Sequence, residues 1–161
     1  MLVNELGQFV SQTRYQSLPA DVVDAIKLRI LDLLAAGLVG FRLGTHKLLL
    51  PVLGGGGQAS VWGLGTKFPL RDAILLNSFI AHSTYLDDGS RYTGGHPSSV
   101  VIPGAIALAE TERATGRDLI ASVAAGYEVF LRLGRAIYPS TVVRGFQSTA
   151  VLGAVASAAA S

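Results

Sequence analysis

The segment from residue 77 to residue 99 concentrates the side chains that could transfer protons. It holds two of the three histidines, two adjacent aspartates, an arginine and two tyrosines. His96 follows Gly94-Gly95, where the backbone can approach a ligand, and precedes a predicted helix that begins at Pro97. The positive end of a helix favours a carboxylate, and an imidazole exchanges protons near pH 7. The pattern favours acid–base chemistry on a carboxylate; a polar surface loop with a capping serine is the alternative.

Two further groups in this segment bear on that chemistry. Asp88 is predicted to orient His96 or to act beside it as a carboxylate. His82 lies three residues after Phe79 on a predicted helix, a spacing more typical of a histidine that faces the core. His82, Asp87, Asp88 and His96 also offer metal-ligand atoms. Their spacing matches no standard ligand pattern, so no metal is predicted.

The run Gly54-Gly55-Gly56-Gly57 lacks a phosphate-binding motif. A phosphate loop needs a lysine and a hydroxyl residue directly after its last glycine, and Gly65-Thr66-Lys67 has them in the wrong order. No G-x-G-x-x-G pattern is present either. The run is interpreted as a flexible loop.

The composition narrows the class of protein. Only 15% of the 161 residues are charged, against about 25% in ordinary domains, so something outside the chain is expected to cover part of the surface. The net charge of +2 and the scattered basic residues disfavour nucleic-acid binding. Without cysteine there is no disulfide or thiol nucleophile.

No signal peptide is recognised, and the most apolar stretch, 30–41, falls short of the roughly 20 residues of a membrane span. A cytoplasmic protein without membrane contact is expected.

Apolar residues recur at helical spacing through most of the chain and predict an all-α fold of five or six helices. A small extended excursion is expected near residues 60–64. The last helix, from residue 148, is apolar on every face, so further residues or another subunit should bury it. The predicted domain, 1–161, is therefore expected to be incomplete at its C-terminal end. The expected helices cover about 2–10, 19–40, 69–85, 97–115, 118–137 and 148–160.

The residues that could take part in catalysis, together with others along the chain, form a pattern that resembles the MmgE/PrpD family. Its hallmark is an Asn and a His on a helix, an acidic loop, then Gly-His-Pro-Ser and an apolar helix with a proline. Further similarity lies in the second helix, around the tryptophan, and before the last helix. The matching residues are Leu31-Asp32-Leu33-Leu34, Val61-Trp62-Gly63, Asn77, His82, Asp87-Asp88, Gly95-His96-Pro97-Ser98, Val101-Ile102-Pro103, Gly116-Arg117-Asp118, Ala125-Gly126-Tyr127-Glu128-Val129 and Arg144-Gly145-Phe146.

The resemblance implies a fold and an activity. It implies the N-terminal helical bundle of a cofactor-independent lyase, a dehydratase or decarboxylase, that removes a proton α to a carboxylate of a small di- or tricarboxylic acid. It also implies a second α+β domain that this chain lacks. The apolar last helix and the low charge favour a homodimer. The expected catalytic residues are His96 and Asp88. The expected substrate-binding residues are Asp87, Tyr85, Arg91, Ser98, Arg144 and Gln147.

Two positions depart from the family pattern. Tyr85 stands where the family's dehydratases and decarboxylases usually carry an acid, and Gln147 where they usually carry a histidine. Neither side chain titrates near neutral pH. An epimerase of a dicarboxylate such as iminodisuccinate is therefore an alternative. A truncated, non-catalytic helical module that only oligomerises is another, and the isolated chain is expected to be inactive.

Overall fold

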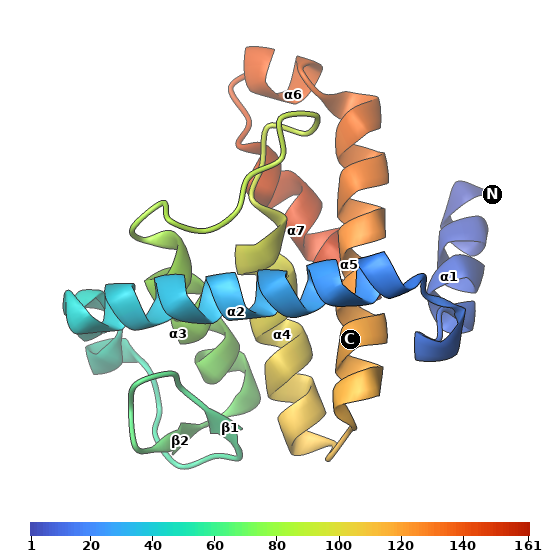
Figure 1. The fold of residues 1–161 in the computed structure, drawn as a ribbon. Helices are drawn as coiled ribbons and strands as arrows, with labels where there is room; N and C mark the ends of the chain where they lie inside the picture. The colour runs from blue at the N-terminus through green and yellow to red at the C-terminus, as the bar shows by residue number, and fades with distance from the viewer.

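One long helix lies across the other long helices of the chain (Figure 1). The computed structural model describes all residues, 1–161. Helix α2 crosses α3, α4 and α5, which pack side by side. Helix α7 packs against α4 and α5, and α1 contacts α5. The bounds are α1 Leu2–Gln12, α2 Ala20–Arg42, α3 Leu70–His82, α4 Pro97–Thr111, α5 Gly116–Ile137 and α7 Ser148–Ala159.

The remaining elements are short. Helix α6 (Ser140–Val143) is a single turn, and three 3-10 helices span Tyr15–Ser17, Thr45–Leu48 and Leu50–Val52. Strand β1 (Ala59–Ser60) pairs antiparallel with β2 (Lys67–Phe68). The predicted all-α fold with a small extended excursion is confirmed. The six longer helices match the predicted number, and α6 is an additional turn where a loop was expected.

The junction between α4 and α5 shows how local chemistry sets a helix boundary. The Thr115 side chain accepts a hydrogen bond from the backbone N–H of Asp118, and the Asp118 carboxylate accepts one from the backbone N–H of Thr115. This reciprocal cap starts α5 at Gly116. Gly116 was expected to follow a helix ending at about Thr115. Helix α4 instead ends at Thr111, and Arg113 adopts the left-handed backbone with φ 54°.

Two polar side chains hold the extended segment on the bundle. The buried Asn77 side chain of α3 accepts a hydrogen bond from the Trp62 backbone N–H and donates one to the Ser60 carbonyl, both at 3.0 Å. Glu110 at the end of α4 accepts hydrogen bonds from the Ser60 backbone and hydroxyl at 2.7 and 2.6 Å, and pairs with Lys67 at 2.7 Å. The excursion is therefore fixed to both α3 and α4.

The Glu110 contacts predict a pH-dependent contribution to stability. Burial alone would raise the pKa of Glu110, but hydrogen bonds from Lys67 and Ser60 outweigh it and hold the pKa below its ordinary value of 4.5. The carboxylate therefore stabilises the fold above that value, and the contribution is lost as the pH falls through the folded-state pKa. We expect Glu110→Gln to lower the free energy of unfolding by about 1–2 kcal/mol at pH 7, and by less at pH 3.

Urea unfolding at the two pH values measures this difference. Glu112→Gln is the matched control, because Glu112 lies exposed two residues further along and its carboxylate makes no hydrogen bond or ion pair within the chain. An equal loss at pH 7 and pH 3, or a loss no larger than that of the control, would contradict the assigned role of Glu110.

Helix α7 is buried on one side rather than all round. Leu152, Gly153 and Ala156 are buried against the bundle, whereas Val151 and Val155 are 42% and 49% exposed. In the centre of the bundle, Leu33, Leu76, Ile80, Ile102 and Phe130 are fully buried and join four helices in one core. None of the helices combines the length and the apolar character that crossing a bilayer requires.

Candidate active site

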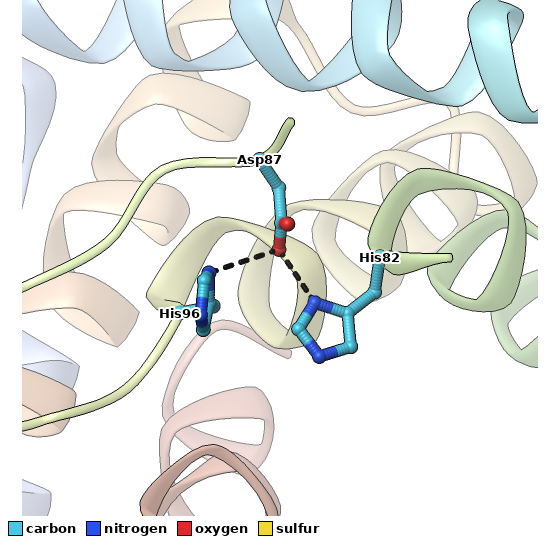
Figure 2. A group of neighbouring side chains, drawn as sticks. All are labelled: His82, Asp87 and His96. Carbon is cyan, nitrogen blue, oxygen red and sulfur yellow. Dashed lines mark hydrogen bonds and ion pairs between the residues drawn. The ribbon is translucent and has the colours of Figure 1, made fainter. Parts of the chain in front are cut away.

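Three side chains from one continuous part of the chain converge at the ends of α3 and α4 (Figure 2). His82 is the last residue of α3, Asp87 lies in the loop that follows, and His96 is the residue that precedes the first turn of α4. Helix α3 was expected to reach about Tyr85. It ends at His82, which frees the chain to turn back and bring Asp87 between the two rings. We call these three residues the His–Asp–His cluster.

The carboxylate of Asp87 is the centre of the cluster. Its side chain is 0% exposed, whereas the side chains of His82 and His96 are 29% and 24% exposed. One oxygen, Oδ2, lies 2.9 Å from His82 Nδ1 and 3.6 Å from His96 Nδ1. The first distance is that of a hydrogen bond and the second exceeds one. His82, which the sequence pattern placed in the core, is thus half-buried and paired with a carboxylate.

The backbone of His96 is fixed by helix α7. The His96 N–H donates to the hydroxyl of Thr149 at 3.0 Å, and the Thr149 N–H donates to the side chain of Gln147 at 2.9 Å. Gly95 permits this approach, because an added Cβ would lie 2.9 Å from the Phe130 ring and 3.1 Å from the Thr149 nitrogen. Gln147, predicted to bind substrate, therefore has its side-chain oxygen engaged in capping α7.

Asp88 contacts a different set of groups from Asp87. Its carboxylate accepts hydrogen bonds from the Ser98 backbone N–H at 3.0 Å and the Tyr127 hydroxyl at 2.9 Å, and Arg29 lies 3.6 Å away. Burial and the neighbouring Asp88 charge raise the pKa of Tyr127, so the phenol remains a hydrogen-bond donor. The bond from Ser98 means that Asp88 caps the first turn of α4 and that no serine side chain does. Asp88 was predicted to orient His96 or to act beside it as a carboxylate; in the structure the carboxylate nearest the His96 ring nitrogen is that of Asp87.

Of the other residues predicted for the site, Tyr85 lies beside the two histidines, whereas Ser98, Arg91 and Arg144 make no hydrogen bond with their rings. Tyr85 is exposed with φ 54°, and its ring centroid lies 5.0 Å from that of His82 and 5.8 Å from that of His96. Ser98 is buried, and its hydroxyl has no hydrogen-bond partner within the chain. Arg91 is exposed and lines a hollow of about 340 Å³ together with Asp88. Arg144 is exposed beside α6 and makes no ion pair within the chain.

Two residues near the site were missed as functional candidates. Arg29, on α2, and Tyr127, on α5, both contact Asp88 and line the same hollow as Arg91. Tyr127 was visible in the sequence only as part of a family-like motif. Arg29 carried no local signal, because its contact with Asp88 depends on how α2 crosses the bundle. The structure thus gathers a second polar group, centred on Asp88, beside the His–Asp–His cluster.

The cluster also has donor atoms of the types that bind divalent metals. One ligand atom from each of His82, Asp87 and His96 lies within 4.8 Å of the others. Imidazoles that bind a metal usually donate their other N–H to a fixed acceptor. If the nitrogens that face Asp87 held a metal together with it, the other nitrogen of each ring would need that acceptor, and in neither histidine does it have one within the chain. We therefore treat the three residues as an acid–base cluster.

The chain belongs to the MmgE/PrpD family, because residues 4–161 match the MmgE/PrpD N-terminal domain. The cis-aconitate decarboxylase-like protein oryM of Aspergillus oryzae (strain ATCC 42149 / RIB 40) is 30% identical, over 98% of this chain and 35% of its own length.

Two cis-aconitate decarboxylases show the same level of similarity. That of Aspergillus terreus is 30% identical over 99% of this chain and 34% of its own length. That of Aspergillus terreus (strain NIH 2624 / FGSC A1156) is 31% identical over 97% of this chain and 34% of its own length. The chain spans about a third of the length of these curated relatives. It is a helical domain of a family that includes lyases.

Proposed function

We propose that this chain forms the helical part of a lyase that removes a proton α to a carboxylate of a small di- or tricarboxylic acid. The observation that carries the proposal is His96, a half-buried imidazole at the start of α4 beside a fully buried carboxylate. An imidazole in such a place can exchange a proton with a bound substrate near neutral pH. In a dehydratase, the electron pair left on the α carbon would expel hydroxide from the neighbouring carbon, and the hydroxide would leave as water. In a decarboxylase, the proton would return at another carbon of the acid, the bond to carbon dioxide would break, and the carbon left with that electron pair would be protonated; neither route requires a cofactor. The similarity to cis-aconitate decarboxylases supports decarboxylation as the reaction.

The group around Asp88 suggests how a substrate carboxylate is held. Arg29 and Arg91 line one hollow beside Asp88. Arg29 is already paired with Asp88, so Arg91 is the cation that remains free for a substrate carboxylate. A guanidinium binds carboxylates through two parallel hydrogen bonds, which would fix the orientation of the substrate. Substrate binding in this hollow and proton transfer at His96 would then both depend on the loop between α3 and α4.

Epimerisation is the second candidate, and the side chains of Tyr85 and Gln147 favour it. Both occupy positions where the family's dehydratases and decarboxylases usually carry a group that transfers protons. Epimerisation by two bases requires one on each face of the carbon. The rings of His82 and His96 are in edge contact, with centroids 4.9 Å apart, so a carbon cannot lie between them. A second base from outside the cluster would therefore be needed.

Incubation of the longest natural product of the gene with a panel of di- and tricarboxylates in D2O tests both candidates. A lyase should release carbon dioxide or form a new carbon–carbon double bond, detected by proton NMR. An epimerase should exchange the α proton for deuterium and invert the centre without either change. Absence of turnover and exchange across the panel would contradict both enzymatic proposals and favour a non-catalytic helical module.

A further inference from the structure

The two adjacent aspartates of the loop between α3 and α4 have different partners. Asp88 is surrounded by a backbone N–H, a phenol and the Arg29 guanidinium. Asp87 is more deeply buried, and the only groups within ion-pair distance of it are the imidazoles of His82 and His96. A buried carboxylate without a fixed cation is stabilised only by the groups that hydrogen-bond to it. His82 is placed to donate an N–H to Asp87, and His96 is the other imidazole near enough to do so after a small movement.

We propose that Asp87 is the positioning residue of His96, holding its ring with the proton on Nδ1 and leaving Nε2 to exchange protons with the substrate. This inference rests on the proposed function, in which His96 carries the proton. A carboxylate that accepts a hydrogen bond from one ring nitrogen fixes both the tautomer and the orientation of an imidazole. Asp87 would thus act through His96 and would not itself touch the substrate.

The geometry of the cluster supports this assignment. Figure 2 shows both rings turned with Nδ1 toward the Asp87 carboxylate, so that the second nitrogen of each ring lies away from it. Asp87 Oδ1 and His96 Nδ1 are both buried and have no hydrogen-bond partner within the chain. The unsatisfied acceptor and the unsatisfied ring nitrogen therefore belong to neighbouring side chains. A small rotation of the carboxylate or the ring would join them.

His82 has a distinct place in this arrangement. Its Nδ1 lies 2.9 Å from Asp87 Oδ2, the distance of a charge-assisted hydrogen bond, whereas His96 Nδ1 is 3.6 Å from the same oxygen. His82 therefore anchors the carboxylate to the end of α3. Catalytic hydrogen bonds are often long before substrate binds and shorten in the complex. We expect the His96–Asp87 contact to shorten in this way while the His82 bond remains.

The tautomer of His96 is the most direct test, and it needs no substrate. Nitrogen-15 NMR of the protein with labelled histidine distinguishes a ring protonated at Nδ1 from one protonated at Nε2. We expect the His96 ring to carry its proton on Nδ1 in the unmodified protein, and to become a mixture of tautomers in Asp87→Asn. Asp88→Asn is the matched comparison: we expect it to lower stability and to leave the His96 tautomer unchanged.

Kinetics provide the second measurement. We expect Asp87→Asn to lower kcat on the order of a hundredfold, with KM changed by less than about threefold, because the substrate contacts remain and only the proton carrier is misoriented. A purely structural role would lower the folded fraction and leave both the tautomer and the turnover of the folded molecules unchanged. That result would overturn the proposal.

Two further outcomes would also overturn it. One is a His96 ring protonated at Nε2 in the unmodified protein, which can be observed even if Asp87→Asn fails to fold. The other is stoichiometric binding of Zn²⁺ that requires both His82 and His96, which would show that the cluster is a metal site. Because the tautomer is measured without substrate, an active His96→Gln variant would reject the proposed function separately from this measurement.

Discussion

Replacing His96 by glutamine should lower the rate with the natural substrate by at least about a hundredfold, equivalent to about 2.7 kcal/mol of transition-state stabilisation. Glutamine preserves the polar character of the side chain but cannot exchange protons near neutral pH. The backbone N–H of His96, which donates to Thr149, is retained in the variant. The start of α4 should therefore keep its place, and the loss should appear mainly in kcat.

The measurement is steady-state kinetics on the longest natural product of the gene, with circular dichroism to confirm folding. His46→Gln is the matched control, because His46 is the remaining histidine and is buried in a stack with Phe41, with ring centroids 4.2 Å apart. After correction for the folded fraction, we expect this control to keep most of the activity. Near-normal activity of His96→Gln would exclude His96 as the proton carrier.

The helices could be predicted from the sequence because their apolar residues repeat at a regular spacing. That spacing depends only on the residues of each helix. The ends were less accurate. Helix α3 stops at His82 and α4 at Thr111, each a few residues early, and both ends precede a residue with φ 54°, Tyr85 and Arg113. Left-handed residues other than glycine carry little sequence signal, so these two ends could not be located.

The sequence singled out the segment that holds the His–Asp–His cluster, but its two aspartates could not be told apart. Neighbouring side chains in a loop can face in any direction. The choice between Asp87 and Asp88 depends on Arg29 of α2 and Tyr127 of α5, which contact only Asp88. Those contacts arise from the way that distant helices cross. The spacing of residues within one segment does not show how distant helices cross, although all three residues of the cluster lie within that segment.

The crossing of α2 and α3 leads to the largest expected effect on stability. At Gly40 the two helices approach so closely that an added Cβ would overlap the Ile80 carbonyl oxygen and lie 2.8 Å from the carbonyl carbon. The obstacle is backbone, which cannot rotate away as a side chain can. We expect Gly40→Ala to lower the free energy of unfolding by at least about 3 kcal/mol, although alanine favours a helix intrinsically.

The effect should reach the His–Asp–His cluster, because Ile80 lies two residues before His82. Hydrogen bonds tie this end of α3 to α2, since Thr45 donates to the Gly40 carbonyl and Ser83 donates to Thr45. Moving the two helices apart would shift His82 away from Asp87. Gly40→Ala should therefore weaken the anchoring of Asp87 as well as the fold, and its remaining folded fraction should turn over substrate more slowly.

Urea unfolding of Gly40→Ala beside Gly7→Ala separates the close contact from the intrinsic preference of alanine. Gly7 lies in the exposed helix α1, and an added Cβ there would meet nothing within 4 Å. Gly7→Ala should be neutral or stabilising by up to about 1 kcal/mol, since alanine replaces glycine in a helix without a clash. If both variants behaved alike, the α2–α3 crossing would be wider than described, and the placement of His82 against Asp87 would have to be revised with it.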